Sequence, residues 1–361
     1  MPDLIGHQEA RQRLAQATRT GRLAQVLLLT GPVGVGKQRL ALWLAQLALC
    51  ERRELEPCGQ CRACRLVAGL GHADVHWFAP IPRPKAGDPD KQVDEAAETL
   101  AGIMEERRHQ PPYTAPDGMA SHPMASVRLL QRRAALTAVE GGPRVFIVGE
   151  ADRLVPQESS PEAANALLKL LEEPPAGSLF VLTAIDPRRV LPTIRSRTVP
   201  VRVQRLSDDE VRSFLRGQPE LSLSPAELEE RVRLAEGSIG LALAMGEGTG
   251  AAYRAAGELL EAVAKGRGAA LERALRQPTY AARGEFAAML DALADTLGEA
   301  ARGALGHPVR RPVPPVLARS GRPERLLRAL ERVAEAREAA AGNVNPQLLL
   351  AVLGAELAEV L

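Results

Sequence analysis

The sequence predicts an α/β fold with a parallel sheet in its first half and all-helical domains in its second half. Three observations support this division. Short apolar runs alternate with segments of helical periodicity, the first apolar run leads through a glycine-rich turn into a helix, and strand signals stop beyond residue 205. Strands that alternate with helices favour a parallel sheet, because parallel strands need a crossover connection.

The first half contains four short apolar runs that we expect to be buried strands, at 26–29, 144–148, 179–184 and 199–203. Segments with helical spacing lie between or before them, at 8–20, 37–49, 125–139 and 161–172. Residues 81–123 begin and end in proline-rich sequence and contain a helical pattern at 91–108. We expect 81–123 to be a surface insertion that carries an exposed helix.

The second half reads as helices throughout. Ser207 precedes three acidic residues, which is typical of an N-cap and the first turn of a helix. Two short helices are expected over 225–247, followed by a helical bundle that proline-rich sequence at 312–315 interrupts. The sequence therefore predicts three domains: an α/β module at 1–204, a small helical lid at 205–247 and a helical domain at 250–361.

Composition limits the possible partners and compartments. The chain has 361 residues, of which 45% are hydrophobic and 25% charged, and its net charge of +2 is too small for global attraction to nucleic acid. The N-terminal residues contain no apolar signal-peptide core, and no apolar run is long enough to span a bilayer. We therefore expect a cytoplasmic protein without a membrane partner.

The glycine-rich turn fits a phosphate loop. Gly31, Gly34, Gly36 and Lys37 follow the spacing G-x-x-x-x-G-K between a strand and a helix. Glycines allow backbone N–H groups to surround phosphate oxygens, and the lysine reaches the outer phosphates. A glycine-rich turn without a ligand is the alternative.

Two residues depart from what ATP hydrolysis requires. Gln38 stands where a Ser or Thr hydroxyl normally ligates Mg²⁺, and Gly149 stands where an acidic residue normally follows the second strand. Glu150 remains as a residue that could orient water, and the alternative is that Glu150 and Asp152 only cap the next turn. ATP binding is therefore expected to be weak or absent.

Four cysteines lie within residues 50–64, at Cys50, Cys58, Cys61 and Cys64. Two overlapping C-x-x-C steps and one upstream cysteine supply four thiolates, which suits a closed structural zinc site. An iron–sulfur cluster or free thiols are the alternatives, and His72 is a fallback ligand.

Several segments together resemble bacterial DNA polymerase III clamp-loader subunits of the AAA+ class. The matching segments are LIGH at 4–7, GPVGVGK at 31–37, the four-cysteine module, GEADRL at 149–154, ANALLKLLEEPP at 164–175, IRSRT at 194–198 and NVNP at 343–346. The resemblance covers the chain except residues 81–123. It implies an AAA+ P-loop module with a zinc insertion, a helical lid and a collar domain that assembles with other subunits.

The departures from the family pattern point to its delta prime branch, whose members lack a working ATPase site. Gly240 occupies the position where motor subunits carry a sensor arginine, and Thr183 occupies the sensor-1 position. The resemblance implies that Arg197 is an arginine finger delivered to a neighbouring ATPase subunit, although an ordinary surface arginine is the alternative. Arg195 could reach DNA phosphate or Glu172.

The expected function is that of a stator within the DNA polymerase III holoenzyme, a DNA-directed DNA polymerase and nucleotidyltransferase complex. The chain would lack ATPase activity of its own and would help to load the sliding clamp onto primed DNA. Expected partners are the gamma/tau and delta subunits, the clamp and, through the complex, primer-template DNA. The alternatives are a gamma/tau-like motor and an AAA+ interaction protein outside replication.

Overall fold

The structure is a computed structural model that describes residues 4–52, 54–109, 120–154, 162–245, 247–278, 285–309, 313–320, 322–340 and 344–361. The described residues form two compact units, the first ending at Ala242 and the second running from Leu243 to Leu361. The predicted α/β module and the greater part of the predicted lid lie together in the first unit. The division into three domains therefore stays a prediction.

The first unit contains a five-stranded parallel sheet with the order β2-β3-β4-β1-β5. Its strands are β1 (Val26–Thr30), β2 (Val75–Phe78), β3 (Arg144–Val148), β4 (Ser178–Ala184) and β5 (Val199–Arg202). The central strands β3 and β4 are buried along their whole length. This explains why they appear in the sequence as continuous apolar runs and not as alternating patterns.

The four predicted strands are confirmed, but β2 was missed. Its four residues include His76 and Trp77, so it has no continuous aliphatic run. Pairing with β3 defines this strand, with Val75 opposite Val145 and Phe78 opposite Val148. This is a long-range contact that the local sequence does not announce.

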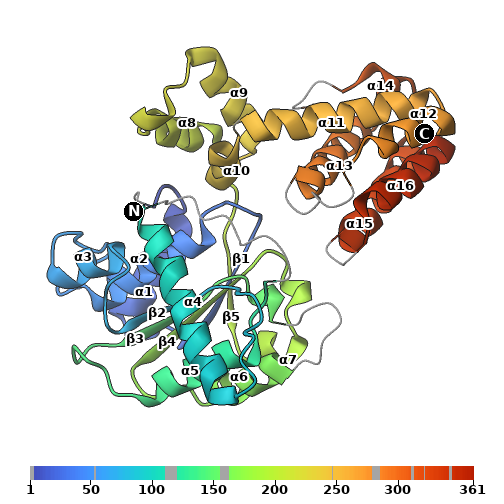
Figure 1. Ribbon diagram of the computed structural model, residues 1–361. Coiled ribbons are helices and arrows are strands. Elements are labelled where there is room, and N and C mark those ends of the chain that lie inside the picture. Colours follow the sequence, from blue (N-terminus) through green and yellow to red (C-terminus); the bar gives the residue numbers. More distant parts are fainter. Residues whose placement is uncertain are drawn as a thin grey trace. The chain divides into compact units, whose positions relative to one another are not determined.

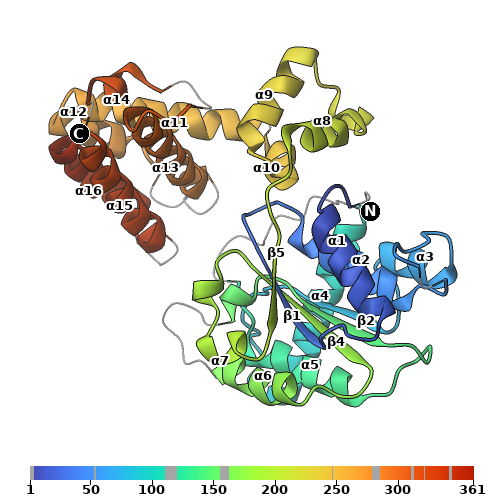
Figure 2. The same cartoon turned by 180° about the vertical axis from the view of Figure 1, so that it is seen from behind.

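Helices cover both faces of the sheet (Figures 1 and 2). One face carries α1 (Gln8–Arg19), α2 (Lys37–Leu49) and α3 (Arg62–Ala68), and the other carries α4 (Pro89–His109), α5 (Met124–Ala135), α6 (Glu162–Glu172) and α7 (Pro192–Arg195). Alternate residues of one strand serve the two cores, because Leu27 packs against the first layer and Leu28 against the second. The parallel α/β fold class is confirmed.

The prediction of an exposed helix within a surface insertion at 81–123 was wrong for its described part. Helix α4 buries Val93, Ala96 and Leu100 in the core between the sheet and the helices α4 to α7, and Ile81 is fully buried. The error arose because polar residues occupy most of the helix while a narrow apolar stripe provides its packing. Residues 110–119 of the predicted insertion lie outside the described residues.

The lid portion of the first unit follows β5. It consists of α8 (Asp208–Arg216), a short 3-10 turn at Pro219–Leu221, α9 (Pro225–Ala235) and the start of α10 (Ile239–Ala244). The predicted N-cap at Ser207 is confirmed as a capping box, in which the Glu210 carboxylate accepts a hydrogen bond from the Ser207 backbone N–H. A second capping box joins Ser224 and Glu227.

The second unit is helical throughout its described residues. Its helices are α11 (Glu247–Ala264), α12 (Arg267–Leu275), α13 (Glu285–Ala304), α14 (Pro315–Ser320), α15 (Pro323–Ala340) and α16 (Pro346–Val360). They enclose one apolar core. Asn345 caps α16 by accepting the Gln347 backbone N–H at 2.9 Å, whereas Asn343 of the same motif lies outside the described residues. Among the described helices, none is long and apolar enough to cross a membrane.

Candidate functional site

The phosphate loop joins β1 to α2 at the carboxyl edge of the sheet, where Gly149 and the end of β4 also lie. Lys37 is the first residue of α2 and is 8% exposed. Its Nζ donates hydrogen bonds to the carbonyl oxygens of Gly31 (2.8 Å) and Pro32 (2.6 Å). Burial lowers the pKa of Lys37 to about 8, although the nearby carboxylates of Asp152 and Glu150 act in the opposite direction.

The lid closes directly onto this loop. The Gly240 backbone N–H donates to the Gly34 carbonyl at 2.9 Å, and the Ser238 hydroxyl donates to the Val33 carbonyl at 2.9 Å. A Cβ atom on Gly240 would lie 2.6 Å from the Gly34 Cα, and one on Gly34 would lie 2.4 Å from the Ser238 Oγ. We call these two hydrogen bonds and the Gly34–Gly240 contact the lid latch.

The lid latch explains why position 240 is a glycine. The two backbones approach so closely that a side chain at either glycine would force them apart. An arginine therefore cannot replace Gly240 without opening the latch. The sequence does not indicate the role of Ser238. No local pattern shows that its hydroxyl bonds the carbonyl of Val33, 205 residues away.

Gln38 and Gly149 stand at the two positions where an ATPase of this class would have its Mg²⁺ ligands. A Cβ on Gly149 would lie 3.1 Å from Gln38 Nε2 and 3.4 Å from Trp77 Nε1, so the two departures from the motor pattern are neighbours in space. The Gln38 amide and the Trp77 indole border the volume in which an acidic side chain at position 149 would stand. Neither group is a preferred Mg²⁺ ligand.

Glu150 is engaged by its own chain. Its carboxylate forms an ion pair with Arg153 at 2.8 Å, and its backbone N–H donates to the Thr183 hydroxyl at 3.0 Å. Burial raises the pKa of Glu150, while the charges of Arg153, Arg107 and Lys37 lower it. The Thr183 hydroxyl thus supports the backbone beside the loop.

Arg107 is a member of this site that the sequence did not reveal. It lies on α4, is 1% exposed, and its guanidinium lies 4.2 Å from the centroid of the Trp77 ring. Such stacking stabilises a buried guanidinium. Its charge also acts on Glu150. The sequence gives no signal for Arg107, because α4 is mostly polar and an arginine on a polar helix is expected to be exposed.

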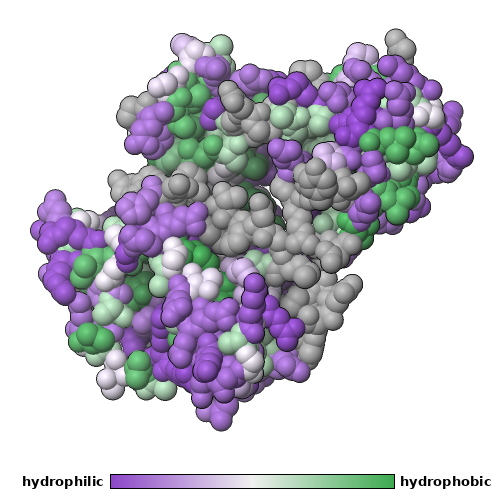
Figure 3. All heavy atoms as spheres, in the orientation of Figure 1, coloured by the Kyte–Doolittle hydropathy of each residue, from purple (hydrophilic) through white to green (hydrophobic). Residues whose placement is uncertain are grey.

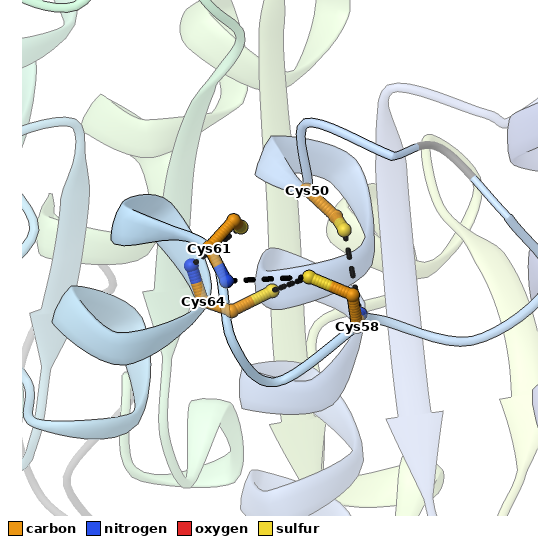
Figure 4. Close-up of side chains that lie close together, drawn as sticks. All are labelled: Cys50, Cys58, Cys61 and Cys64. Carbon is orange, nitrogen blue, oxygen red and sulfur yellow. Dashed lines mark hydrogen bonds between the residues drawn. The ribbon is translucent and has the colours of Figure 1, made fainter.

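The four cysteines lie together at one end of α2 and around α3, as Figure 4 shows. Their sulfur atoms all lie within 4.8 Å of one another, and Cys58 Sγ is 4.0 Å from Cys64 Sγ. A tetrahedral site with metal–sulfur bonds of about 2.3 Å requires sulfur separations of roughly 3.8 Å. The group can therefore hold a metal ion after small adjustments.

Backbone N–H groups point at three of these sulfur atoms. Cys58 N donates to Cys50 Sγ at 3.4 Å, Cys61 N to Cys58 Sγ at 3.3 Å, and Cys64 N to Cys61 Sγ at 3.4 Å. The bond from Cys61 N is the largest cause that lowers the pKa of Cys58 to about 6, whereas burial raises the pKa of Cys64. Hydrogen bonds to sulfur favour the thiolate form that metals bind.

The fallback ligand His72 has other partners. Its Nδ1 accepts the Asp74 backbone N–H at 3.1 Å, and its Nε2 faces the Glu140 carboxylate at 3.5 Å. It does not belong to the sulfur group. The candidate metal site consists of the four cysteines.

Arg197 lies just after α7, on the surface of the first unit. It forms an ion pair with Glu172, the last residue of α6, and its Nε donates to Glu172 Oε1 at 2.7 Å. Its Nη1 donates to the Thr193 carbonyl at 2.7 Å and to the Ser196 hydroxyl at 3.2 Å. Glu172 thus contacts Arg197, not Arg195.

The sequence-predicted residues fall into three groups in space. The loop glycines and Lys37 lie with Gln38, Gly149 and Glu150, and the four cysteines form a separate cluster. The partners of Arg197 are Glu172, Thr193 and Ser196, none of which belongs to the loop. Within one chain, therefore, the predicted finger and the predicted phosphate site are separate features.

A comparison with protein families matches the part of the chain that contains these three groups of residues. The family described as "DNA polymerase III, delta subunit" matches residues 6–207, which is more than half of the chain. The chain belongs to this family. The matched region contains the phosphate loop, the cysteine cluster and Arg197.

The chain is also similar to DNA polymerase III subunits of several bacteria. The DNA polymerase III subunit delta' of Pseudomonas aeruginosa is 32% identical over 49% of this chain and 42% of its own length. The delta' subunit of Escherichia coli is 29% identical over 66% of this chain and 59% of its own, and the gamma/tau subunit of Mycobacterium bovis is 29% identical over 54% and 27%. The matches thus span less than two thirds of each relative.

Proposed function

We propose that this chain is a delta prime-type stator of a bacterial DNA polymerase III clamp loader, a subunit that does not hydrolyse ATP. The observation that carries the proposal is the state of the phosphate site. Gln38 and Gly149 replace the metal ligands, and the lid latch brings Gly240 onto the loop where a sensor arginine would stand. Gly31, Gly34, Gly36 and Lys37 keep the shape of the loop, and nucleotide binding is weak or absent.

Arg197 acts on a neighbouring subunit in this proposal. A guanidinium delivered to the γ-phosphate of a neighbour's ATP stabilises the charge of the transition state. The surface position of Arg197, with 32% of its side chain exposed, supports this role. The chain would then contribute a catalytic group to an ATPase without having an active ATPase site of its own.

The second unit is the proposed collar. Leu271 and Leu275 of α12 and Leu348 and Val352 of α16 are each between 48% and 63% exposed, and Gln347 Nε2 bonds the Leu275 carbonyl at 2.8 Å. Figure 3 shows hydrophobic surface around α16. Exposed apolar groups on neighbouring helices suit assembly with other subunits. The proposed partners are gamma/tau and delta, the sliding clamp and, through the complex, primer-template DNA in the cytoplasm.

The cysteine cluster is proposed to bind zinc. Four thiolates leave no open coordination position, so the ion would be structural and would stabilise the loop between α2 and α3. We expect one zinc atom per chain by elemental analysis. Cys58→Ser should lose that atom and lower the melting temperature, whereas a full zinc content in this variant would contradict the assignment.

The second candidate function is a gamma/tau-like motor. The Mycobacterium bovis gamma/tau subunit has the same 29% identity as the Escherichia coli delta' subunit, over a smaller share of both chains, and Glu150 lies beside the loop. A motor would need to open the lid latch and to bind Mg²⁺ without the usual ligands. The contact between Glu150 and Arg153 also weighs against a role for Glu150 in orienting water.

Two ATPase measurements separate these functions. The purified chain should show negligible Mg²⁺-dependent turnover, and robust turnover by the chain alone would favour the motor. In the complex reassembled with gamma/tau and delta, Arg197→Ala should lower DNA-stimulated turnover by about tenfold or more. Arg189→Ala, at an exposed arginine eight residues earlier in the chain, is the matched control and should retain turnover. Failure of the chain to assemble with these subunits would favour an AAA+ protein outside replication.

A further inference from the structure

The surroundings of Arg197 carry an inference that rests on the proposed function. An arginine finger must reach a neighbour in one orientation, yet an unrestrained arginine at a surface turn samples many rotamers. Arg197 is not unrestrained. Its guanidinium contacts the carboxylate of Glu172 from α6 and two oxygens from the α7 turn.

We propose that Glu172 is the positioning residue of the arginine finger. Its carboxylate receives both Nε and Nη2 of Arg197 on the single oxygen Oε1. The α7 turn fixes the opposite side of the guanidinium, where Nη1 donates to Thr193 and Ser196. The plane of the guanidinium is therefore defined by the α7 turn and by the end of α6, where Glu172 lies 25 residues before Arg197.

The number of donors shows that the finger is held without being blocked. A guanidinium has five N–H groups. The four contacts use Nε–H, one N–H of Nη2 and both N–H groups of Nη1. One N–H of Nη2 is left for a further acceptor, so a phosphate oxygen can be bound while Glu172 keeps its contact.

The supporting turn is itself ordered. The Ser196 hydroxyl donates to the Thr193 carbonyl at 3.0 Å and thereby presents its lone pairs to Arg197. Ile194, between them, is fully buried in the core beneath the sheet. This anchor keeps the turn in place while the guanidinium remains accessible. Glu172 likewise ends a helix whose Leu171 is buried.

Positioning has a defined kinetic consequence. A preorganised donor lowers the barrier to reaction, because the orientation of the guanidinium no longer has to be found in the transition state. Loss of the positioning residue should therefore lower kcat of the assembled ATPase while the KM for ATP stays unchanged. A purely structural residue would instead reduce folding or assembly.

The test uses the reassembled complex with gamma/tau, delta and the clamp, and measures DNA-stimulated ATP hydrolysis. Glu172→Gln keeps the size of the side chain and removes its charge. We expect kcat to fall by about threefold to tenfold with an unchanged KM. Glu173→Gln is the matched control, because Glu173 is the adjacent exposed acid and, among the described residues, forms no ion pair. It should leave kcat unchanged.

A double-mutant cycle isolates the role of the pair. In the Arg197→Ala background, Glu172→Gln should have no additional effect on kcat, because there is no finger left to position. An additional loss of the same size as in the wild type would overturn the proposal. So would a wild-type or raised kcat in Glu172→Gln alone, since a raised value would mean that Glu172 restrains the finger.

The outcomes also distinguish this inference from the proposed function. If Arg197→Ala leaves turnover intact, the arginine-donor function fails. If Arg197→Ala lowers turnover while Glu172→Gln does not, only the positioning role fails. Gel filtration of each reassembled complex ensures that a loss of turnover is not a loss of assembly.

Discussion

The basic residue of the phosphate loop and that of the α6–α7 surface differ in their burial and in their hydrogen-bond partners. Lys37 is buried and donates to carbonyls of its own loop, and the lid latch covers that loop. Arg197 is partly exposed, is held by Glu172 and keeps one N–H for another acceptor. One cation is bound by carbonyls of its own loop, while the other, in the proposed function, is held for a neighbouring subunit.

This difference indicates that the phosphate loop has a structural role in this chain, whatever its role in binding nucleotide. The loop connects β1 to α2, and the lid rests on it through Gly34 and Gly240. Both contacts require the compact turn that glycines provide. In the proposed function, the residue that acts on another molecule is the less conspicuous one, Arg197 after the short helix α7.

The largest expected effect compares the two cations directly. In the reassembled complex, Arg197→Ala should lower ATP turnover by about tenfold or more, whereas Lys37→Met should change it by less than about twofold. The reason is that, within the part of the chain that the structure describes, Lys37 Nζ donates its hydrogen bonds to the loop carbonyls of Gly31 and Pro32. Steady-state ATPase assays check both variants. An equal loss in Lys37→Met would mean that the loop binds a nucleotide that the complex uses.

The lid latch gives the next largest effect. Gly240→Ala introduces a Cβ only 2.6 Å from the Gly34 Cα, so the lid must shift from the loop. We expect the free energy of unfolding to fall by about 1–3 kcal/mol, as for other overpacked contacts. Urea denaturation measures it. Gly257→Ala on α11 is the control, because a Cβ there meets nothing within 4 Å and alanine favours helices.

If Gly240→Ala were as stable as the wild type, the latch would not contribute to the fold. The closed loop would then no longer support the proposed lack of turnover, and that proposal would depend on the replaced metal ligands alone.

The smallest expected effect concerns the charge of Lys37. Burial lowers its pKa from 10.5 to about 8, so the folded state disfavours the proton that the unfolded state keeps. The cost of the buried charge is fully present below pH 8 and is relieved as the pH rises from about 8 towards 10.5. We expect Lys37→Met to gain stability relative to the wild type at pH 7, by about 1 kcal/mol.

Urea denaturation of both proteins measures this difference in the free energy of unfolding, which should shrink at pH 9 and above. Measuring the difference between the two proteins cancels the titration of other groups. A stability difference that is independent of pH would show that burial does not disfavour the charge of Lys37. Lys37 would then resemble the partly exposed Arg197 more than a buried cation.

Local patterns were sufficient for much of the α/β unit. The apolar run at 26–29 and the glycines after it predicted β1, the loop and α2. The spacing of Cys50, Cys58, Cys61 and Cys64 predicted that their sulfur atoms would meet. In each case the interacting residues are close in sequence, so that the chain geometry between them is limited.

Contacts between distant segments could not be read in this way. Helix α4 was judged by its polar majority, but its apolar stripe lies against the sheet and brings Arg107 to Trp77. Strand β2 exists because β3 pairs with it. Local propensity is a weak guide wherever burial is decided by a neighbour that the sequence does not identify.

The sequence by itself determined the parallel α/β fold, the missing metal ligands and the cysteine cluster, because each depends on residue types at short, fixed spacing. Only the tertiary structure decided that Gly240 seals the loop and that Glu172 holds Arg197. These two contacts join segments 206 and 25 residues apart, counted from the numbers of the bonded residues. Their geometry arises when the lid, the loop and the two helices pack together, and no local pattern encodes it.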